Sequence, residues 1–122
     1  FIEVNNLIDA NVDGTHASNS AFALGLIQGG QFTGMSAGQL AAEFWDGEAA
    51  ARASVTSWLY AYLMTAYRPL PSEDLEAYIA LSRSDVGQKL NAAILGAFDV
   101  VFAEISYATG RAVAFHMGAQ EL

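Results

Sequence analysis

The sequence predicts an all-α fold, an irregular bundle of five or six helices with a long C-terminal helix. Apolar residues recur at spacings of three and four along most of the chain, whereas no segment alternates polar and apolar residues for long. Glycine pairs, prolines and small polar residues mark the ends of these periodic segments. Hydrophobic residues make up 53% of the 122 positions and charged residues 15%, so we expect a single helical domain over 1–122.

The first helix is predicted to begin near Ser18, with Phe22 and Leu26 on its apolar face. The pair Gly29-Gly30 should end it, because glycine readily adopts the backbone conformation that terminates a helix.

Residues 9–14 precede this helix and match the first half of an EF-hand calcium loop. Oxygen-bearing side chains at alternate positions suit a hard cation, so Asp9, Asn11 and Asp13 are weak calcium candidates. Ser20 stands where the loop needs a bidentate acid. This departure favours the simpler interpretation, an Asx-rich turn between two helices.

Ser36 is predicted to cap the second helix, because Gln39 completes a capping box with it. The segment 34–38 also matches the G-x-S-x-G elbow of serine hydrolases, which requires a buried strand before the serine. Residues 31–33 are too few and too close to glycines to form that strand. Capping therefore explains Ser36, and we predict no catalytic residue. The apolar residues of this helix are Leu40, Phe44 and Trp45.

The third helix should start at an Asp46 cap, with Glu48 in its first turn where the helix dipole favours an acid. Residues 68–71, Arg-Pro-Leu-Pro, should end it, because proline cannot continue a helix. The uncharged stretch 53–67 is shorter than the roughly 20 residues that span a bilayer, so we expect no membrane span. The apolar stripe of this helix comprises Val55, Trp58, Leu59, Tyr62, Leu63 and Ala66.

A Ser72 cap is predicted to open the fourth helix, with its apolar side facing inward. Three acids near its start suit the helix dipole better than they suit acid–base catalysis. The inward residues are Leu75, Tyr78 and Ile79, and the acids are Glu73, Asp74 and Glu76.

After a break at 82–87, one apolar pattern continues almost to the end of the chain. Unbroken, about 30 residues would form a helix roughly 45 Å long, with Gly96 and Gly110 as its weak points. A helix that is apolar on two faces needs a partner, and self-association is the simplest one, so we predict a homodimer. The main apolar line is Leu90, Ile94, Phe98, Val101, Ile105, Ala108, Ala112 and Phe115, and the second line is Leu95, Phe102 and Val113.

Composition and charge argue against several classes of function. Thirteen acids and five bases give a net charge of −8, which disfavours nucleic acid and anionic membranes as partners. There is no cysteine, and His16 and His116 are too far apart in sequence to form a zinc motif. We therefore expect no confident metal site, no cofactor and no enzymatic activity.

Aromatic residues give the candidate binding surface. We predict a module that binds a protein partner or itself through the aromatic middle helix and the final helix. The alternative is a small apolar-ligand binding or carrier domain with a pocket between helices, lined by Trp45, Trp58 and Tyr62. The ligand or interface candidates are Trp45, Trp58, Tyr60, Tyr62 and Phe102.

Residues 70–90 resemble the signature of domain-of-unknown-function family 2059, and the resemblance covers the last third to half of the chain. In that family, a helix with acids near its start leads to a Ser-Pro-x-Gly-x-Lys element that opens a long final helix. Ser84, Gly87 and Lys89 match this element here, whereas Asp85 replaces the proline. Ser84 should act as the cap, and Gly87 should let the turn pack closely.

The resemblance implies an all-helical, exported bacterial protein, because most members carry a cleaved export signal in Gram-negative bacteria. It therefore implies a periplasmic location. The chain begins at Phe1 without an initiating methionine, so we expect it to be the mature or trimmed part of a longer chain. The family has no assigned activity and supplies no site residues.

Overall fold

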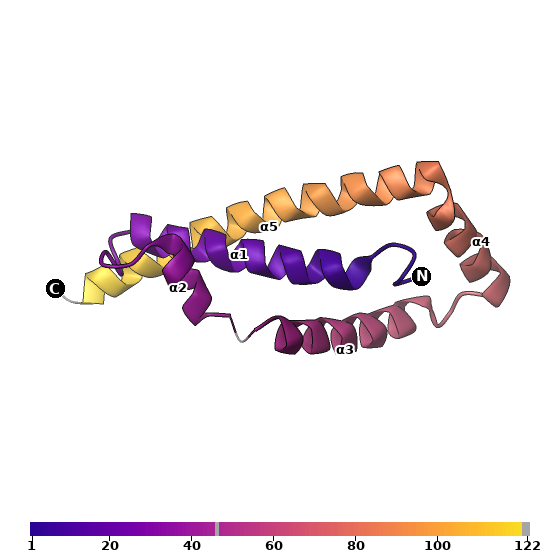
Figure 1. Ribbon diagram of the computed structural model, residues 1–122, viewed down its shortest axis with the longest axis horizontal. Helices are drawn as coiled ribbons and strands as arrows, with labels where there is room; N and C mark the ends of the chain where they lie inside the picture. Colours follow the sequence, from indigo (N-terminus) through magenta and orange to yellow (C-terminus); the bar gives the residue numbers. More distant parts are fainter. Residues whose placement is uncertain (46, 121–122) are drawn as a thin grey trace. The chain divides into compact units, whose positions relative to one another are not determined.

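The computed structural model describes residues 1–45 and 47–120, and every regular element in these residues is an α-helix. The predicted all-α fold with a long C-terminal helix is confirmed (Figure 1). The helices are α1 (Leu7–Gln28), α2 (Ala37–Glu43), α3 (Glu48–Tyr67), α4 (Ser72–Arg83) and α5 (Asp85–Gln120).

Several helix ends lie where local chemistry predicts them. After α1, Gly30 has a φ of 97°, a conformation that glycine adopts without strain. Ser36 caps α2 through a complete capping box, in which its hydroxyl accepts from the Gln39 amide at 3.2 Å. The prolines of 68–71 follow the end of α3 at Tyr67.

Two predicted starts are wrong. The first helix begins at Leu7 instead of near Ser18, so no turn interrupts 9–14. Within α1 the Asn11 amide donates to the Leu7 carbonyl at 2.7 Å, a bond that is compatible with a helix. Ser72 is the first residue of α4 and not its cap; the cap position is held by Pro71, which makes no side-chain cap bond. The predicted Asp46 cap lies outside the described residues.

The chain divides into two compact units. The first unit comprises residues 1–12 and 48–96, and the second comprises residues 13–47 and 97–122. Helices α1 and α5 each contribute to both units. That residues 1–122 form a single domain stays a prediction.

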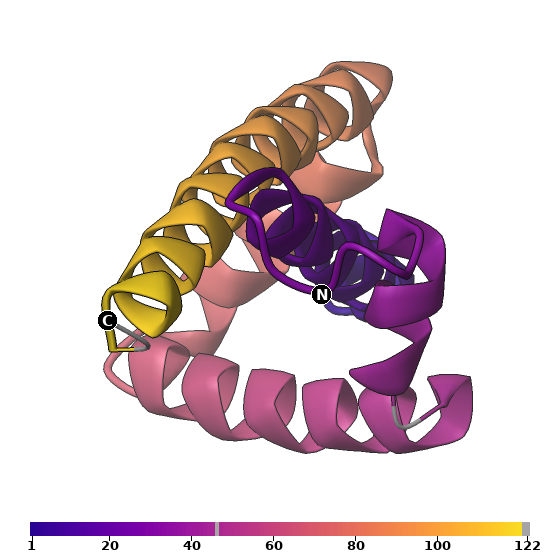
Figure 2. The same cartoon turned by 90° about the vertical axis from the view of Figure 1, so that its left-hand side faces the viewer.

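In the second unit, α5 packs against α1 through residues without large side chains (Figure 1). A Cβ added at Gly25 would lie 2.2 Å from the Tyr107 carbonyl oxygen, and one at Gly110 would lie 2.2 Å from the Phe22 carbonyl oxygen. The two backbones are therefore in direct contact. Helix α2 lies beside α1 (Figure 2) and contributes to the core of this unit. The core consists of Ala23, Leu26, Leu40, Ala41 and Ala114.

The side of α5 that contacts α1 is formed by small residues. The main line of large apolar residues on α5 is exposed, and the residues buried against α1 are Gly110 and Ala114. The reason is steric: glycine and alanine allow an approach that Phe98 or Ile105 would prevent. The predicted weak points do not break the helix, since α5 continues through Gly96 and Gly110.

In the first unit, the turn between α4 and α5 matches the prediction. The Ser84 hydroxyl accepts from the Gly87 amide at 3.1 Å and so caps α5. A Cβ at Gly87 would lie 2.0 Å from the Leu81 carbonyl oxygen, so the turn requires glycine at this position.

Candidate functional site

The first candidate site is the exposed apolar side of α5. We call it the α5 apolar face and define it as Leu90, Ile94, Phe98, Val101, Phe102 and Ile105, which are between 45% and 55% exposed. The Phe98 and Phe102 rings stack at 5.9 Å between centroids. At about 100° per residue, this face lies roughly opposite Gly110 and Ala114.

No charged residue lies within the α5 apolar face. Between positions 90 and 105 the only charged residues of the helix are Asp99 and Glu104. Each falls about 90° or more from the centre of the face, on opposite sides of it. A partner of this face therefore meets an uncharged surface with acids along its borders.

Helix α5 is also the one described helix that is long and apolar enough to cross a membrane, judged by length and composition alone. Its most apolar 18-residue window has a mean hydropathy of 1.4 and is not buried. One such helix is weak evidence of a span, because core helices of soluble proteins meet the same criterion. The expected absence of a membrane span stays a prediction.

The second candidate site is a pocket of about 730 Å³ in the first unit. It is formed by the N-terminal segment 1–3, the C-terminal half of α3 and the side of α4. Leu63 of α3 and Leu75 and Ile79 of α4 line the pocket, and all three are half-buried. Spacings of four residues place such side chains on one side of each helix.

Two of the aromatic rings that line the pocket, those of Phe1 and Tyr67, pack against each other. Phe1 packs edge-on against Tyr67, with 5.5 Å between ring centroids, and lies 4.9 Å from the ring of Tyr78. Burial of Tyr67, together with the neighbouring Tyr78 hydroxyl, raises the pKa of Tyr67 above its ordinary value. Tyr67 thus keeps its proton at neutral pH and remains uncharged.

A polar cluster fixes the N-terminal wall of this pocket. The buried Asn5 side chain donates to the Phe1 carbonyl at 3.1 Å and accepts from the Asn91 amide. Gln88 of α5 donates to the Val4 carbonyl at 2.9 Å. These bonds tie residues 1–5 to the beginning of α5, so the wall is held by side chains that are distant in sequence.

Two opposite charges lie at the pocket, Glu3 and Arg68. Both are exposed, and within the described residues neither side chain makes a hydrogen bond or an ion pair. Arg68 comes directly after the end of α3, where the chain turns toward α4.

The predicted aromatic candidates are distributed over both units. Only Tyr60 lines the pocket. Trp58 and Tyr62 stack on each other at 5.5 Å and are exposed, whereas Trp45 packs edge-on against His16 at 5.1 Å in the other unit. Phe102 belongs to the α5 apolar face.

Sequence reasoning missed the N-terminal wall and Arg68 as pocket residues. The inward spacing of Leu75 and Ile79 was a usable signal for one wall. No local pattern indicates that Phe1 lies beside α4.

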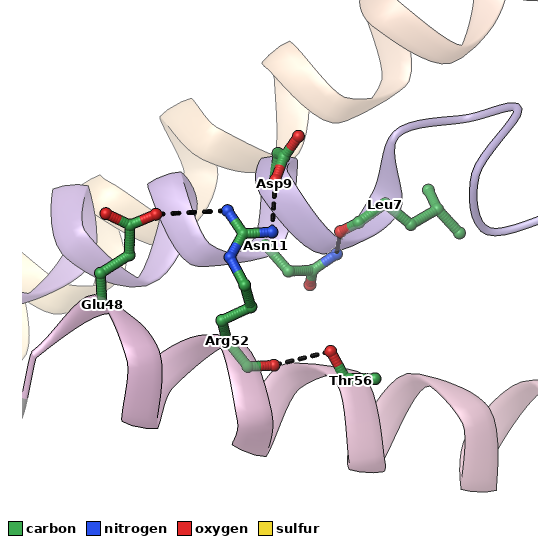
Figure 3. A network of polar contacts seen from close by, with 6 residues as sticks. All are labelled: Leu7, Asp9, Asn11, Glu48, Arg52 and Thr56. Carbon is green, nitrogen blue, oxygen red and sulfur yellow. Dashed lines mark hydrogen bonds and ion pairs between the residues drawn. The ribbon is translucent and has the colours of Figure 1, made fainter.

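The three calcium candidates lie on one continuous helix, and Figure 3 shows two of them, Asp9 and Asn11. Arg52 of α3 bonds to the Asp9 carboxylate at 2.6 Å and to Glu48 at 3.3 Å, and the bond to Asp9 is the main reason that the pKa of Arg52 is raised. Residues two apart lie about 200° around a helix, so Asn11 points away from the side that Asp9 and Asp13 share, and the three side chains do not converge. The helix removes the turn on which the calcium hypothesis depended.

Other titratable clusters give no site in the described residues. No group of three or more His, Asp or Glu side chains there could hold a metal ion. Glu73, Asp74 and Glu76 are all exposed in the first turns of α4. His116 contacts the neighbouring Phe115 ring at 5.9 Å.

Comparison with known proteins adds no assignment: no protein-family model, curated protein or solved structure matches the chain. The resemblance of residues 70–90 to domain-of-unknown-function family 2059 therefore stays a prediction.

Proposed function

We propose that this chain is a non-enzymatic helical module of the cell envelope that associates with a second copy of itself through the α5 apolar face. The observation that supports the proposal is the way in which α5 packs against α1. Its small residues are buried against α1, while its large apolar residues face outward. Exposed large apolar side chains in a continuous stripe are characteristic of interaction surfaces.

The area of this face fits a protein interface. At roughly 100 Å² for each half-exposed large side chain, the six residues present about 600 Å². The largest apolar patch on a typical monomer is about 300–600 Å², so this face is at the upper end of that range. The exposed Ala97 and Ala108 enlarge it toward the roughly 800 Å² that each partner contributes to a standard interface.

A second copy suits this face better than a charged partner does. The face has no charge to match, and the chain as a whole carries −8. Under a two-fold axis the stripe meets its own copy, so apolar side chains contact apolar side chains on both halves. The acids at its borders stay in water in such an arrangement.

Sedimentation equilibrium tests the proposal. The chain is expected to dimerise, and the double variant Phe98→Glu, Ile105→Glu is expected to weaken dimerisation at least tenfold, because it would bury charge without a partner. Val100→Glu is the matched control: Val100 is 59% exposed on the same helix but lies off the face, so this variant should still dimerise.

A chain that stays monomeric at high concentration would contradict the proposal. A monomeric chain that binds lipid vesicles through α5 would also contradict it, since a lipid surface and not a second copy would then cover the α5 apolar face.

The location in the cell envelope depends only on the resemblance of residues 70–90. Fractionation of a Gram-negative host that expresses the complete natural gene product should place the protein in the periplasm. Recovery only from the cytoplasm would remove this part of the proposal.

A further inference from the structure

We infer that the pocket between α3, α4 and the N-terminal segment binds a small amphipathic carboxylate, with its apolar body among Leu63, Leu75 and Ile79 and its head group on Arg68. This inference is independent of the proposed dimer, because it uses none of the residues of the α5 apolar face. It also differs from the predicted pocket, since neither tryptophan lines it.

The size and lining of the pocket support an apolar body. A volume of about 730 Å³ falls within the range of small-molecule sites, about 300–1,000 Å³. The walls are mostly aliphatic and aromatic, and Met64 at the edge is flexible enough to adapt to different shapes. A ligand that covers Leu63, Leu75 and Ile79 would remove from water the apolar surface that these half-buried residues still expose.

The walls are built to stay open in the absence of a ligand. The prolines of 68–71 prevent α3 and α4 from continuing as one helix, so a turn joins them next to Arg68. The Asn5 cluster fixes the opposite wall through bonds to Phe1 and Asn91. A pocket with preformed walls loses little conformational freedom on binding.

Arg68 determines the charge of the ligand. Its guanidinium has no ionic partner in the described residues, although the chain carries an excess of acids. A planar fork of N–H donors matches a carboxylate in a bidentate way. Glu3 at the same pocket would repel a second negative charge, so the site favours a monoanion.

Calorimetric titration with decanoate, below its micellar concentration, tests the inference, and decanol is the uncharged match. We expect decanoate to bind at least tenfold more tightly than decanol. Arg68→Gln should remove this difference, because it should lower the affinity for decanoate and leave the affinity for decanol unchanged. The control is Arg83→Gln, which removes an exposed cation of α4 that does not line the pocket. This control should change neither affinity.

Two further variants locate the ligand. Leu75→Trp, checked for helical content by circular dichroism, should fill the pocket and abolish binding of both compounds. The dimerisation variant Phe98→Glu, Ile105→Glu should bind decanoate as the natural sequence does.

Equal affinity for decanoate and decanol would overturn the inference. Stronger binding of decylammonium, undiminished binding to Leu75→Trp, or loss of binding in Phe98→Glu, Ile105→Glu would overturn it as well. Each of these outcomes leaves the sedimentation test of the dimer unaffected.

Discussion

Glycines at the crossing of α1 and α5 show how single atoms set the distance between two helices. At Gly110 a methyl group has no room, because the Phe22 carbonyl oxygen would lie 2.2 Å from it. At Gly96, on the same helix, no atom lies within 4 Å of the same position. The two glycines therefore have opposite roles, although nothing in the local sequence separates them.

Alanine at these two positions should shift stability in opposite directions. Gly110→Ala is expected to lower the free energy of unfolding by about 1–3 kcal/mol, because the crossing must open. Gly96→Ala should raise it by about 0.5–1 kcal/mol, because alanine has less backbone freedom to lose in a helix. Urea denaturation measures both, and equal effects would contradict the close contact at Gly110.

Tyr67 should make the stability of the folded chain depend on pH in the alkaline range. Burial, with Tyr78 nearby, raises the pKa of Tyr67 above its ordinary value of 10.0. The unfolded chain therefore loses this proton at a lower pH than the folded chain, so the folded state binds more protons above pH 10. The contribution of Tyr67 to the free energy of unfolding is therefore complete below pH 10. It is lost as the pH rises through the pKa that Tyr67 has in the folded chain.

Urea midpoints measured from pH 8 to pH 11 test this sign. The natural sequence should lose stability above pH 10, and Tyr67→Phe should lose less over the same interval. A variant that loses as much as the natural sequence would show that Tyr67 is not responsible.

Among the helices, α2 depends most on its cap. It has seven residues, yet it supplies Leu40 and Ala41 to the core of the second unit. So short a helix is unstable in isolation, and the reciprocal bonds of Ser36 and Gln39 satisfy two of its free amides.

Ser36→Ala should therefore lower the free energy of unfolding by about 1 kcal/mol. Ser57→Ala, at an exposed position within α3, is the control and should leave stability nearly unchanged. A loss for Ser36→Ala no larger than that of the control would mean that the capping box contributes nothing.

Helix ends could be predicted where one residue decides them, but the side of α5 that contacts α1 could not. Ser36, Pro69 and Ser84 act on their own neighbours, so their effects are visible in a few positions of sequence. Periodicity groups Phe98 with Ile105 on one side of α5 but does not say which side meets α1. That choice depends on Gly25 and Gly110, which are remote in sequence and come together only in the fold.

At the scale of the whole molecule, the two candidate sites differ in how far the sequence could reveal them. The stripe on α5 could be recognised as a surface that needs a partner, because all its residues lie on one helix. The pocket could not, because its walls combine residues 1–3 with α3 and α4. Side chains such as Asn5 and Asn91, which hold those walls, carry no pattern of their own.

Self-association should make thermal stability depend on chain concentration. If two copies share the α5 apolar face, each tenfold increase in concentration stabilises the folded dimer by about 1.4 kcal/mol. The melting temperature should rise accordingly for the natural sequence and for Val100→Glu. It should be independent of concentration for Phe98→Glu, Ile105→Glu, and a constant value in all three would contradict the dimer.

The contact between Gly25 and Gly110 also affects the entropy of folding. Glycine has no rotamers, so bringing these positions together immobilises no side chain, and the conformational cost falls on the backbone alone. The large side chains of α5 lie on its other side and are exposed to solvent. Folding of the monomer therefore does not require these outer side chains to be ordered, and in the proposed dimer their entropic cost would fall on association instead.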